Sequence, residues 1–202
     1  MASPTTQSRT RLTREKTRAR IIEAATELVR VRSYAELNVG EIMDRAGIGR
    51  TLFYRHFDDL GDLLLSAGRD AIEELYEAQL ALASTRATHD SDAIRQALEV
   101  PVAVYRRHGP LLRAVVEAAA ADQLVAAGQE ELRRRFDGLV EGTLRAMAEE
   151  GGREFADVAE TARALNLLNE SYLLDAFGRE PRISTETAVQ TLSEIWVAFI
   201  NR

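Results

Sequence analysis

Five hydrogen-bond donors lie within a span of seven residues near the N-terminus: Arg50, Thr51, Tyr54, Arg55 and His56. Guanidinium groups attract phosphate, and guanidinium, hydroxyl and imidazole donors also reach the edges of bases. Apolar residues at Leu52, Phe53 and Phe57 interleave with these donors, so the donors are expected on the outer face of a short helix. The run therefore predicts a surface that contacts the phosphates and bases of DNA.

Two short helices joined by a tight turn must position these donors. Asn38 is a favourable N-cap with Glu41 three residues later, which predicts a helix over Val39–Ala46. Gly47 ends this helix, because glycine tolerates the left-handed conformation of a tight exit. A second helix is predicted over Arg50–Phe57. The spacing is typical of a helix-turn-helix, whose second helix enters a major groove about 12 Å wide.

A preceding helix is needed to complete a three-helix core. Apolar residues between Ile21 and Val29 recur at helical spacing, which predicts a helix that starts at Thr13 and ends near Tyr34. The apolar residues expected to meet in this core are Ile22, Ala25, Val29, Tyr34, Leu37, Ile42, Ile48, Leu52, Phe53 and Phe57.

Positive charge gathers at the same end of the chain. Residues 1–57 carry 11 lysines and arginines against 6 acidic residues, a balance of +5, whereas residues 58–202 carry 15 against 26, a balance of −11. A basic head on an acidic body is typical of a DNA-binding domain joined to a domain with another partner, although ordinary surface charge is the alternative. Residues 1–12 (Met1–Leu12) lack periodicity and are predicted to form a disordered basic arm, with Arg9 and Arg11 near phosphates.

These elements together resemble the TetR family of bacterial regulators. The resemblance rests on the run Ile48–Phe57, preceded by the helix and glycine of Val39–Gly47, and covers about residues 14–65. It implies a homodimeric transcription regulator whose C-terminal domain binds a small molecule that releases the DNA. By position, it also implies groove and phosphate contacts at Arg50, Thr51, Tyr54, Arg55 and His56, and a phosphate contact at Asn38.

The rest of the chain predicts helices and no strand. Apolar stripes of helical period cover residues 60–82, 93–107, 110–119, 123–149, 156–177 and 185–200. Pro110 suits the first turn of a new helix after Gly109, and Pro101 is expected to kink or interrupt its helix. The fold class is therefore all-α with nine helices. Three form a DNA-binding head (residues 1–57), and six form a ligand-binding and dimerisation body (residues 58–202).

The C-terminal part resembles the ethionamide-resistance-regulator branch of the same family, in Ala164–Glu170 and Glu194–Val197. This resemblance implies an elongated, mostly apolar pocket lined by Asn166, Asn169 and Trp196. The two amides share one helix face and need partners if buried, so they orient an effector or bond nearby backbone or the dimer mate. Further candidates for the pocket wall offer aromatic, aliphatic or sulfur surface: Tyr105, Phe136, Leu139, Met147, Leu173 and Phe177.

The effector is expected to be neutral or zwitterionic and mainly apolar, because the acidic body repels anions. Leu192, Trp196 and Ile200 recur every four residues, which predicts the seam of a four-helix bundle between the last two helices of two protomers. The triplet Arg133–Arg135 is expected on a solvated face.

Several classes of function are disfavoured. The chain has no cysteine, which excludes disulfides and thiolate catalysis, and its histidines at His56, His89 and His108 lie far apart. No phosphate loop or nucleophile elbow stands out, so neither an enzyme nor a metal or other cofactor is expected. No apolar run reaches the roughly 18–20 residues of a membrane span, and a cytoplasmic protein is expected. A helical small-molecule-binding protein and a ligand-independent DNA-binding regulator remain as alternatives.

Overall fold

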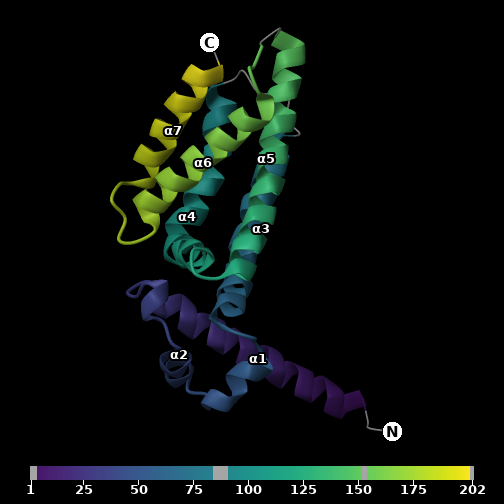
Figure 1. The fold of residues 1–202 in the computed structure, drawn as a ribbon, viewed down its shortest axis with the longest axis vertical. Coiled ribbons are helices and arrows are strands. Elements are labelled where there is room, and N and C mark those ends of the chain that lie inside the picture. Colours follow the sequence, from purple (N-terminus) through teal and green to yellow (C-terminus); the bar gives the residue numbers. More distant parts are fainter. Residues whose placement is uncertain (1–3, 84–90, 152–153, 201–202) are drawn as a thin grey trace.

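The computed structural model describes residues 4–83, 91–151 and 154–200, and every regular element in these ranges is a helix, which confirms the all-α prediction. The elements are α1 (Pro4–Leu28), η1 (Tyr34–Glu36), α2 (Val39–Ala46), η2 (Arg50–Arg55), α3 (Leu60–Ala83), α4 (Ser91–Ala119), α5 (Gln123–Gly151), α6 (Val158–Phe177) and α7 (Thr185–Ile200), where η marks a 3₁₀ helix. Figure 1 shows α1 and α2 as a head beneath an elongated body of α3 to α7.

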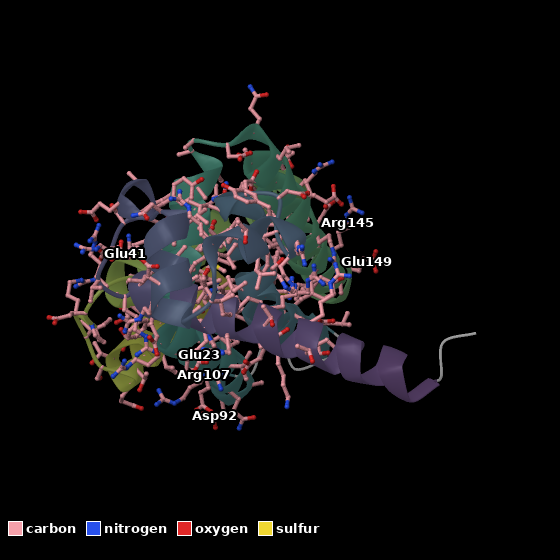
Figure 2. All side chains as sticks on the ribbon, turned by 90° about the horizontal axis from the view of Figure 1, so that it is seen from below. Glu23, Glu41, Asp92, Arg107, Arg145 and Glu149 are labelled. Carbon is pink, nitrogen blue, oxygen red and sulfur yellow. The ribbon has the colours of Figure 1, made fainter. Side chains whose placement is uncertain are left out.

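The first helix begins earlier than predicted. The expected disorder of residues 1–12 is wrong for residues 4–12, because α1 begins at Pro4. Proline suits a first helical turn, where its missing N–H would have no intrahelical partner in any case. Figures 1 and 2 show this end of α1 projecting beyond the rest of the head.

The caps predicted for α2 are confirmed. The side-chain oxygen of Asn38 accepts a hydrogen bond from the backbone N–H of Glu41 at 2.9 Å. Gly47 has a φ of 63°, the left-handed conformation that favours glycine. The guanidinium of Arg20 on α1 also donates to the carbonyl oxygen of Ala46 at 2.5 Å. These contacts fix where α2 ends and how the following turn leaves it.

The second helix of the helix-turn-helix differs from the prediction in type and length. An α-helix was expected over Arg50–Phe57, whereas the structure has the 3₁₀ helix η2 over Arg50–Arg55. Its N-cap is Gly49, which has no side chain to satisfy the first backbone N–H groups. So short an element is compatible with 3₁₀ geometry, which proteins use in short pieces.

The apolar core of the head continues into the body. The ten predicted core residues are all present, six of them buried and the others partly buried against the same cluster. That cluster also includes Leu63 and Leu64 of α3 and Leu111 and Val115 of α4. The core therefore does not stop at the expected boundary between residues 57 and 58, and residues of α3 and α4 pack directly against those of the head.

The predicted break before Pro110 is wrong, because α4 includes both Pro101 and Pro110 and the described body has five helices in place of the expected six. Pro110 lacks the N–H that would bond the carbonyl of Arg106, and Figure 1 shows α4 changing direction in its lower part. Gly109 serves packing here. A Cβ at this position would collide with the carbonyl oxygen of Phe177 at the end of α6.

The stripe predicted as the dimer seam faces the interior of the protomer. Leu192 is 0% exposed in a cluster between α4, α6 and α7, and Trp196 packs against the same cluster. The side chain of Ile200 lies outside the described side chains. The large apolar residues that α6 and α7 leave exposed are instead Leu167, Leu168 and Ile195. Spacing identified an apolar stripe, but an i, i+4 pattern does not distinguish a protomer core from a seam.

None of the helices in the described ranges combines the length and the apolar character needed to cross a bilayer.

Candidate nucleic-acid interface and ligand pocket

The predicted DNA-contacting donors lie on the outer surface of the head. Arg50, Thr51, Tyr54 and Arg55 are exposed, whereas Phe53 of the same 3₁₀ helix is buried in the head core. Tyr54 is 64% exposed, and its ring meets Phe53 edge-on with centroids 5.2 Å apart. The buried phenyl ring thus orients an outward-facing tyrosine, as a groove contact requires.

His56 has an unusual environment at the end of η2. Its Nδ1 is buried and has no hydrogen-bond partner among the described residues. Burial lowers the pKa of His56, and the positive charges of Arg14, Arg18 and Arg55 lower it further. The neutral imidazole is therefore favoured at neutral pH in the DNA-free protein.

Two arginines of α1 join this surface, although the sequence analysis did not select them as contacts. A guanidinium nitrogen of Arg14 donates to the carbonyl oxygen of Arg55 at 3.4 Å. The guanidinium of Arg18 lies 4.9 Å from the ring centroid of Phe57. Their i, i+4 spacing off the apolar stripe was the available signal. Both add positive charge beside η2.

The remaining predicted DNA contacts lie nearby or fall outside the described side chains. Asn38 is exposed at the start of α2, where its oxygen is already used as the cap. The Asn38 and Arg50 side chains both lie close to Gly40, where a Cβ would be 3.2 Å from Oδ1 of Asn38 and 3.7 Å from Nη1 of Arg50. Arg9 and Arg11 belong to α1, but their side chains are outside the described part.

A pocket of about 190 Å³ lies between α3, α4, α5 and α6. Its apolar wall consists of Leu65, Ile72, Leu75, Ala97, Leu98, Pro101, Leu112, Val115, Val116, Leu132, Phe136, Leu167, Leu173 and Leu174. Its polar lining consists of Gln79, Tyr105, Gln129, Arg133, Asp137, Arg163, Asn166, Asn169 and Glu170. A mainly apolar cavity with a limited set of polar groups is the usual form of a small-molecule site.

Both asparagines predicted for this site line it, and both also bond to the protein. Asn166 accepts a hydrogen bond from Gln79 at 3.3 Å and donates one to Asp137 at 2.8 Å. Asn169 accepts a hydrogen bond from the indole N–H of Trp196 at 3.2 Å. Among the described residues, the partners of the two amides are side chains of other helices.

An ion pair crosses the polar side of the pocket. Arg133 of α5 donates to Glu170 of α6 through Nε at 3.1 Å and through Nη2 at 3.2 Å. The prediction of a solvated face is therefore wrong for Arg133, whose side chain is only a third exposed. Burial raises the pKa of the neighbouring Tyr105, and the charge of Glu170 raises it further, so its hydroxyl remains a hydrogen-bond donor.

Five of the predicted wall residues line this pocket: Tyr105, Phe136, Asn166, Asn169 and Leu173. The other four lie elsewhere. Met147 packs in a cluster between α5 and α6, and Phe177 packs between α4, α6 and α7. Trp196 reaches the pocket only through Asn169, and Leu139 is half-buried outside the lining.

None of the four charged side chains that line the pocket, Arg133, Asp137, Arg163 and Glu170, was predicted there from the sequence. Gln129, Arg133 and Asp137 repeat every four residues along α5, and this spacing could have revealed a polar stripe. The sequence could not show that this stripe faces the interior, because the partner of Arg133 is Glu170, 37 positions later. His89, one of the three histidines that lie far apart in the sequence, is outside the described residues.

Comparison with known proteins matches both halves of the chain. Residues 21–67 match the family "Bacterial regulatory proteins, tetR family", and residues 94–201 match "Transcriptional regulator EthR, C-terminal domain". The HTH-type transcriptional regulator EthR of Mycolicibacterium smegmatis is 26% identical over 204 residues, covering 96% of this chain and 94% of that protein. EthR of Mycobacterium tuberculosis is 27% identical over 183 residues, covering 89% and 85%.

Solved structures share the fold. The TetR family regulator PfmR from Thermus thermophilus has a TM-score of 0.73 at 18% identity, covering 88% of this chain and 97% of that one. The regulator FadR from Bacillus subtilis, in complex with stearoyl-CoA, has a TM-score of 0.68 at 14% identity, covering 89% and 97%.

Proposed function

Because the chain belongs to the TetR family of DNA-binding transcription regulators, with an EthR-type C-terminal domain that binds an effector, we propose that it is a homodimeric repressor released from its operator by a small, mainly apolar molecule. One observation carries the proposal. The apolar core beneath the exposed donors of η2 is continuous with α3 and α4, and both helices also line the pocket. Occupancy of the pocket and the orientation of the donors are therefore coupled through shared helices.

In this proposal the head (residues 1–57) reads the operator. Arg50, Thr51, Tyr54, Arg55 and His56 contact bases and phosphates of the major groove, and Asn38 with the N-terminus of α2 meets a phosphate. Arg14 and Arg18 add phosphate contacts beside η2. Arg9 and Arg11 extend the same basic helix away from the head, where they lie near the DNA backbone.

The pocket favours an uncharged or zwitterionic effector. Its two arginines are matched by two carboxylates, through the pair Arg133–Glu170 and through Arg163, whose guanidinium lies 3.8 Å from Asp137. A cavity of about 150 Å³ accommodates benzene, so the present volume admits a ring or a short chain. A longer effector needs the walls of the pocket to move, and in this proposal the displacement of a wall helix is the means of release.

A second copy of the chain is the proposed partner of α6 and α7. The exposed Leu168 and Ile195 lie on these neighbouring helices, on faces turned away from the protomer core. Two copies paired through these faces form a four-helix bundle. Such a dimer presents two heads to successive major grooves, about 34–36 Å apart.

The test is operator selection combined with recovery of the effector. The purified protein is used to select fragments of its own genome, and small molecules extracted from it are identified by mass spectrometry. We expect the selected DNA to bind more tightly than shuffled DNA of the same composition. We also expect the identified molecule to weaken the binding of the protein to the selected DNA. If no fragment binds more tightly than its shuffled counterpart, the proposal is wrong.

A further inference from the structure

One largely buried arginine of α4, Arg113, contacts both the head and the end of α6, in addition to the apolar core that the head and the body share. The side chain of Arg113 is only 11% exposed, although it carries a permanent charge. Its neighbours in sequence, Leu112 and Val115, line the pocket. A largely buried guanidinium is stable only when its donors are used, and the described contacts use all three of its nitrogens.

Two of these contacts hold the turn that follows α1. Nη2 of Arg113 donates to the carbonyl oxygen of Val29 at 2.9 Å and to that of Arg32 at 3.1 Å. Carbonyl groups at the exit of a helix have no intrahelical partner, so the guanidinium both satisfies and orients those of Val29 and Arg32, just after α1. α1 carries Arg14 and Arg18 beside η2. A change in the position of its C-terminal end therefore changes the position of the proposed DNA-contacting surface.

Glu117 completes the attachment one helical turn later. One carboxylate oxygen accepts from Nη1 of Arg113, and the other accepts from the backbone N–H of Tyr34 at 2.8 Å. The pair therefore grips both sides of the connection between α1 and η1. A charge-assisted network of this kind fixes geometry more strictly than apolar packing alone.

The remaining donor of Arg113 holds the end of α6. Its Nε donates to the carbonyl oxygen of Gly178 at 2.7 Å. A Cβ on Gly178 would lie 3.4 Å from both Cβ and Cδ of Arg113, so the chain passes close to the arginine stem. Asn166, Asn169 and Glu170 of the pocket are on this same α6. One side chain thus connects a pocket helix to the head.

From these contacts we infer that Arg113 and Glu117 form a latch that sets the angle between head and body and releases it when an occupied pocket displaces α6 relative to α4. The inference rests on the proposed function, because it gives the pathway by which an effector acts on the operator contacts. Arg113 and Glu117 are positioning residues and touch neither DNA nor effector. A ligand shifts this equilibrium only as far as it prefers the displaced arrangement.

The test measures the position of the head directly. The chain has no cysteine, so Asp44→Cys in the exposed part of α2 and Arg145→Cys in the exposed part of α5 give two unique spin-label sites. Labelled protein is mixed with an excess of unlabelled protein, so that nearly every dimer that carries label contains only one labelled protomer. The distance distribution is then recorded for the parent, for Arg113→Gln and for Arg113→Lys. Arg107→Gln is the matched control, because Arg107 lies on the same helix as Arg113 and its substitution removes an exposed ion pair with Glu74 of α3.

We expect Arg113→Gln to broaden or shift the distribution and to weaken operator binding about tenfold, within the usual range of coupling between sites. For Arg113→Lys, the distance distribution and the operator affinity should lie between those of the parent and of Arg113→Gln. The ammonium retains the charge but cannot reach all of the acceptors. Arg107→Gln should match the parent. If Arg113→Gln fails to fold, Glu117→Gln provides the same comparison, since it keeps the side-chain size and removes the charge pair. An unchanged distribution in the folded variant overturns the latch.

Transmission from the pocket is tested without a known effector. Ala97→Phe fills part of the pocket from α4 and serves as the probe of occupancy. We expect Ala97→Phe to shift the distance distribution when it is introduced into the parent protein. It should have little further effect when it is introduced into Arg113→Gln. Equal displacement in both backgrounds overturns the inference. If the parent selects no operator, the proposed function fails, while the distance measurements still decide whether the latch exists.

Discussion

The indole Nε1 of Trp196 donates a hydrogen bond to Oδ1 of Asn169 over 3.2 Å, and this contact ties α7 to the pocket face of α6. One of the two lone pairs of this amide oxygen is therefore used within the protomer. We expect an effector that bonds to Asn169 to accept from its amide N–H₂, as a carbonyl group would.

Replacing Asn169 with leucine should lower the free energy of unfolding by about 1–3 kcal/mol, because the half-buried indole N–H loses its acceptor. The measurement is urea unfolding of the dimer. Trp196→Phe is the matched partner, since it keeps an aromatic ring and removes the donor. In the double variant the two losses should be less than additive. Strict additivity would show that the two side chains act independently.

Removing the hydroxyl of Tyr54 should weaken operator binding without destabilising the head. Tyr54→Phe keeps the edge-on ring contact with Phe53, so we expect unfolding to change by less than about 0.5 kcal/mol. Binding measured by fluorescence anisotropy should weaken by roughly 1–3 kcal/mol. Phe53→Ala is the contrasting variant and should destabilise the head by about 3–5 kcal/mol. Unaltered affinity in Tyr54→Phe would remove this hydroxyl from the interface.

Acidification should destabilise the protein through two histidines. Burial is the main cause that lowers the pKa of His56 and of His108 below the ordinary value of 6.5. The folded chain therefore binds fewer protons than the unfolded chain between the folded and unfolded pKa values. The stability from the neutral imidazoles is complete above 6.5 and is lost as pH falls through the lowered values.

Urea unfolding from about pH 7.5 toward about pH 5 measures this loss. His56→Gln and His108→Gln should each make the decline shallower, and the double variant shallower still. If the double variant declines as steeply as the parent, other groups are responsible.

Charged substitutions on α7 should distinguish residues of the proposed dimer contact from residues of the protomer core. Ile195 is 37% exposed, so Ile195→Glu should give a folded protein that sediments as a monomer. Leu192→Glu should instead lower the melting temperature severely, because it buries an unpaired carboxylate. Intact dimers of Ile195→Glu would place the interface on another surface.

Local chemistry was predictable, and long-range partnership was not. The predicted cap roles of Asn38 and Gly47 were correct, because a cap and a left-handed turn depend on residues within one helical turn. The trihelical core followed from periodicity alone. Gly109 and Pro110 suggested a break, but packing against the end of α6 overrode that local preference. Arg133 resembled a surface arginine because nothing near it in sequence reveals Glu170.

The contact between Gly109 and the carbonyl of Phe177 places backbone against backbone, with no compliant side chain between the two helices. We expect α4 and α6 to pivot about this contact more easily than they slide past each other, so that the contact would act as a fulcrum. Asn166 and Leu173 lie 11 and 4 residues from it along α6, about 16 and 6 Å of lever arm. A molecule that pushes near Asn166 therefore turns α6 with more leverage than one that pushes near Leu173, so potency should depend on how deep along α6 an effector binds.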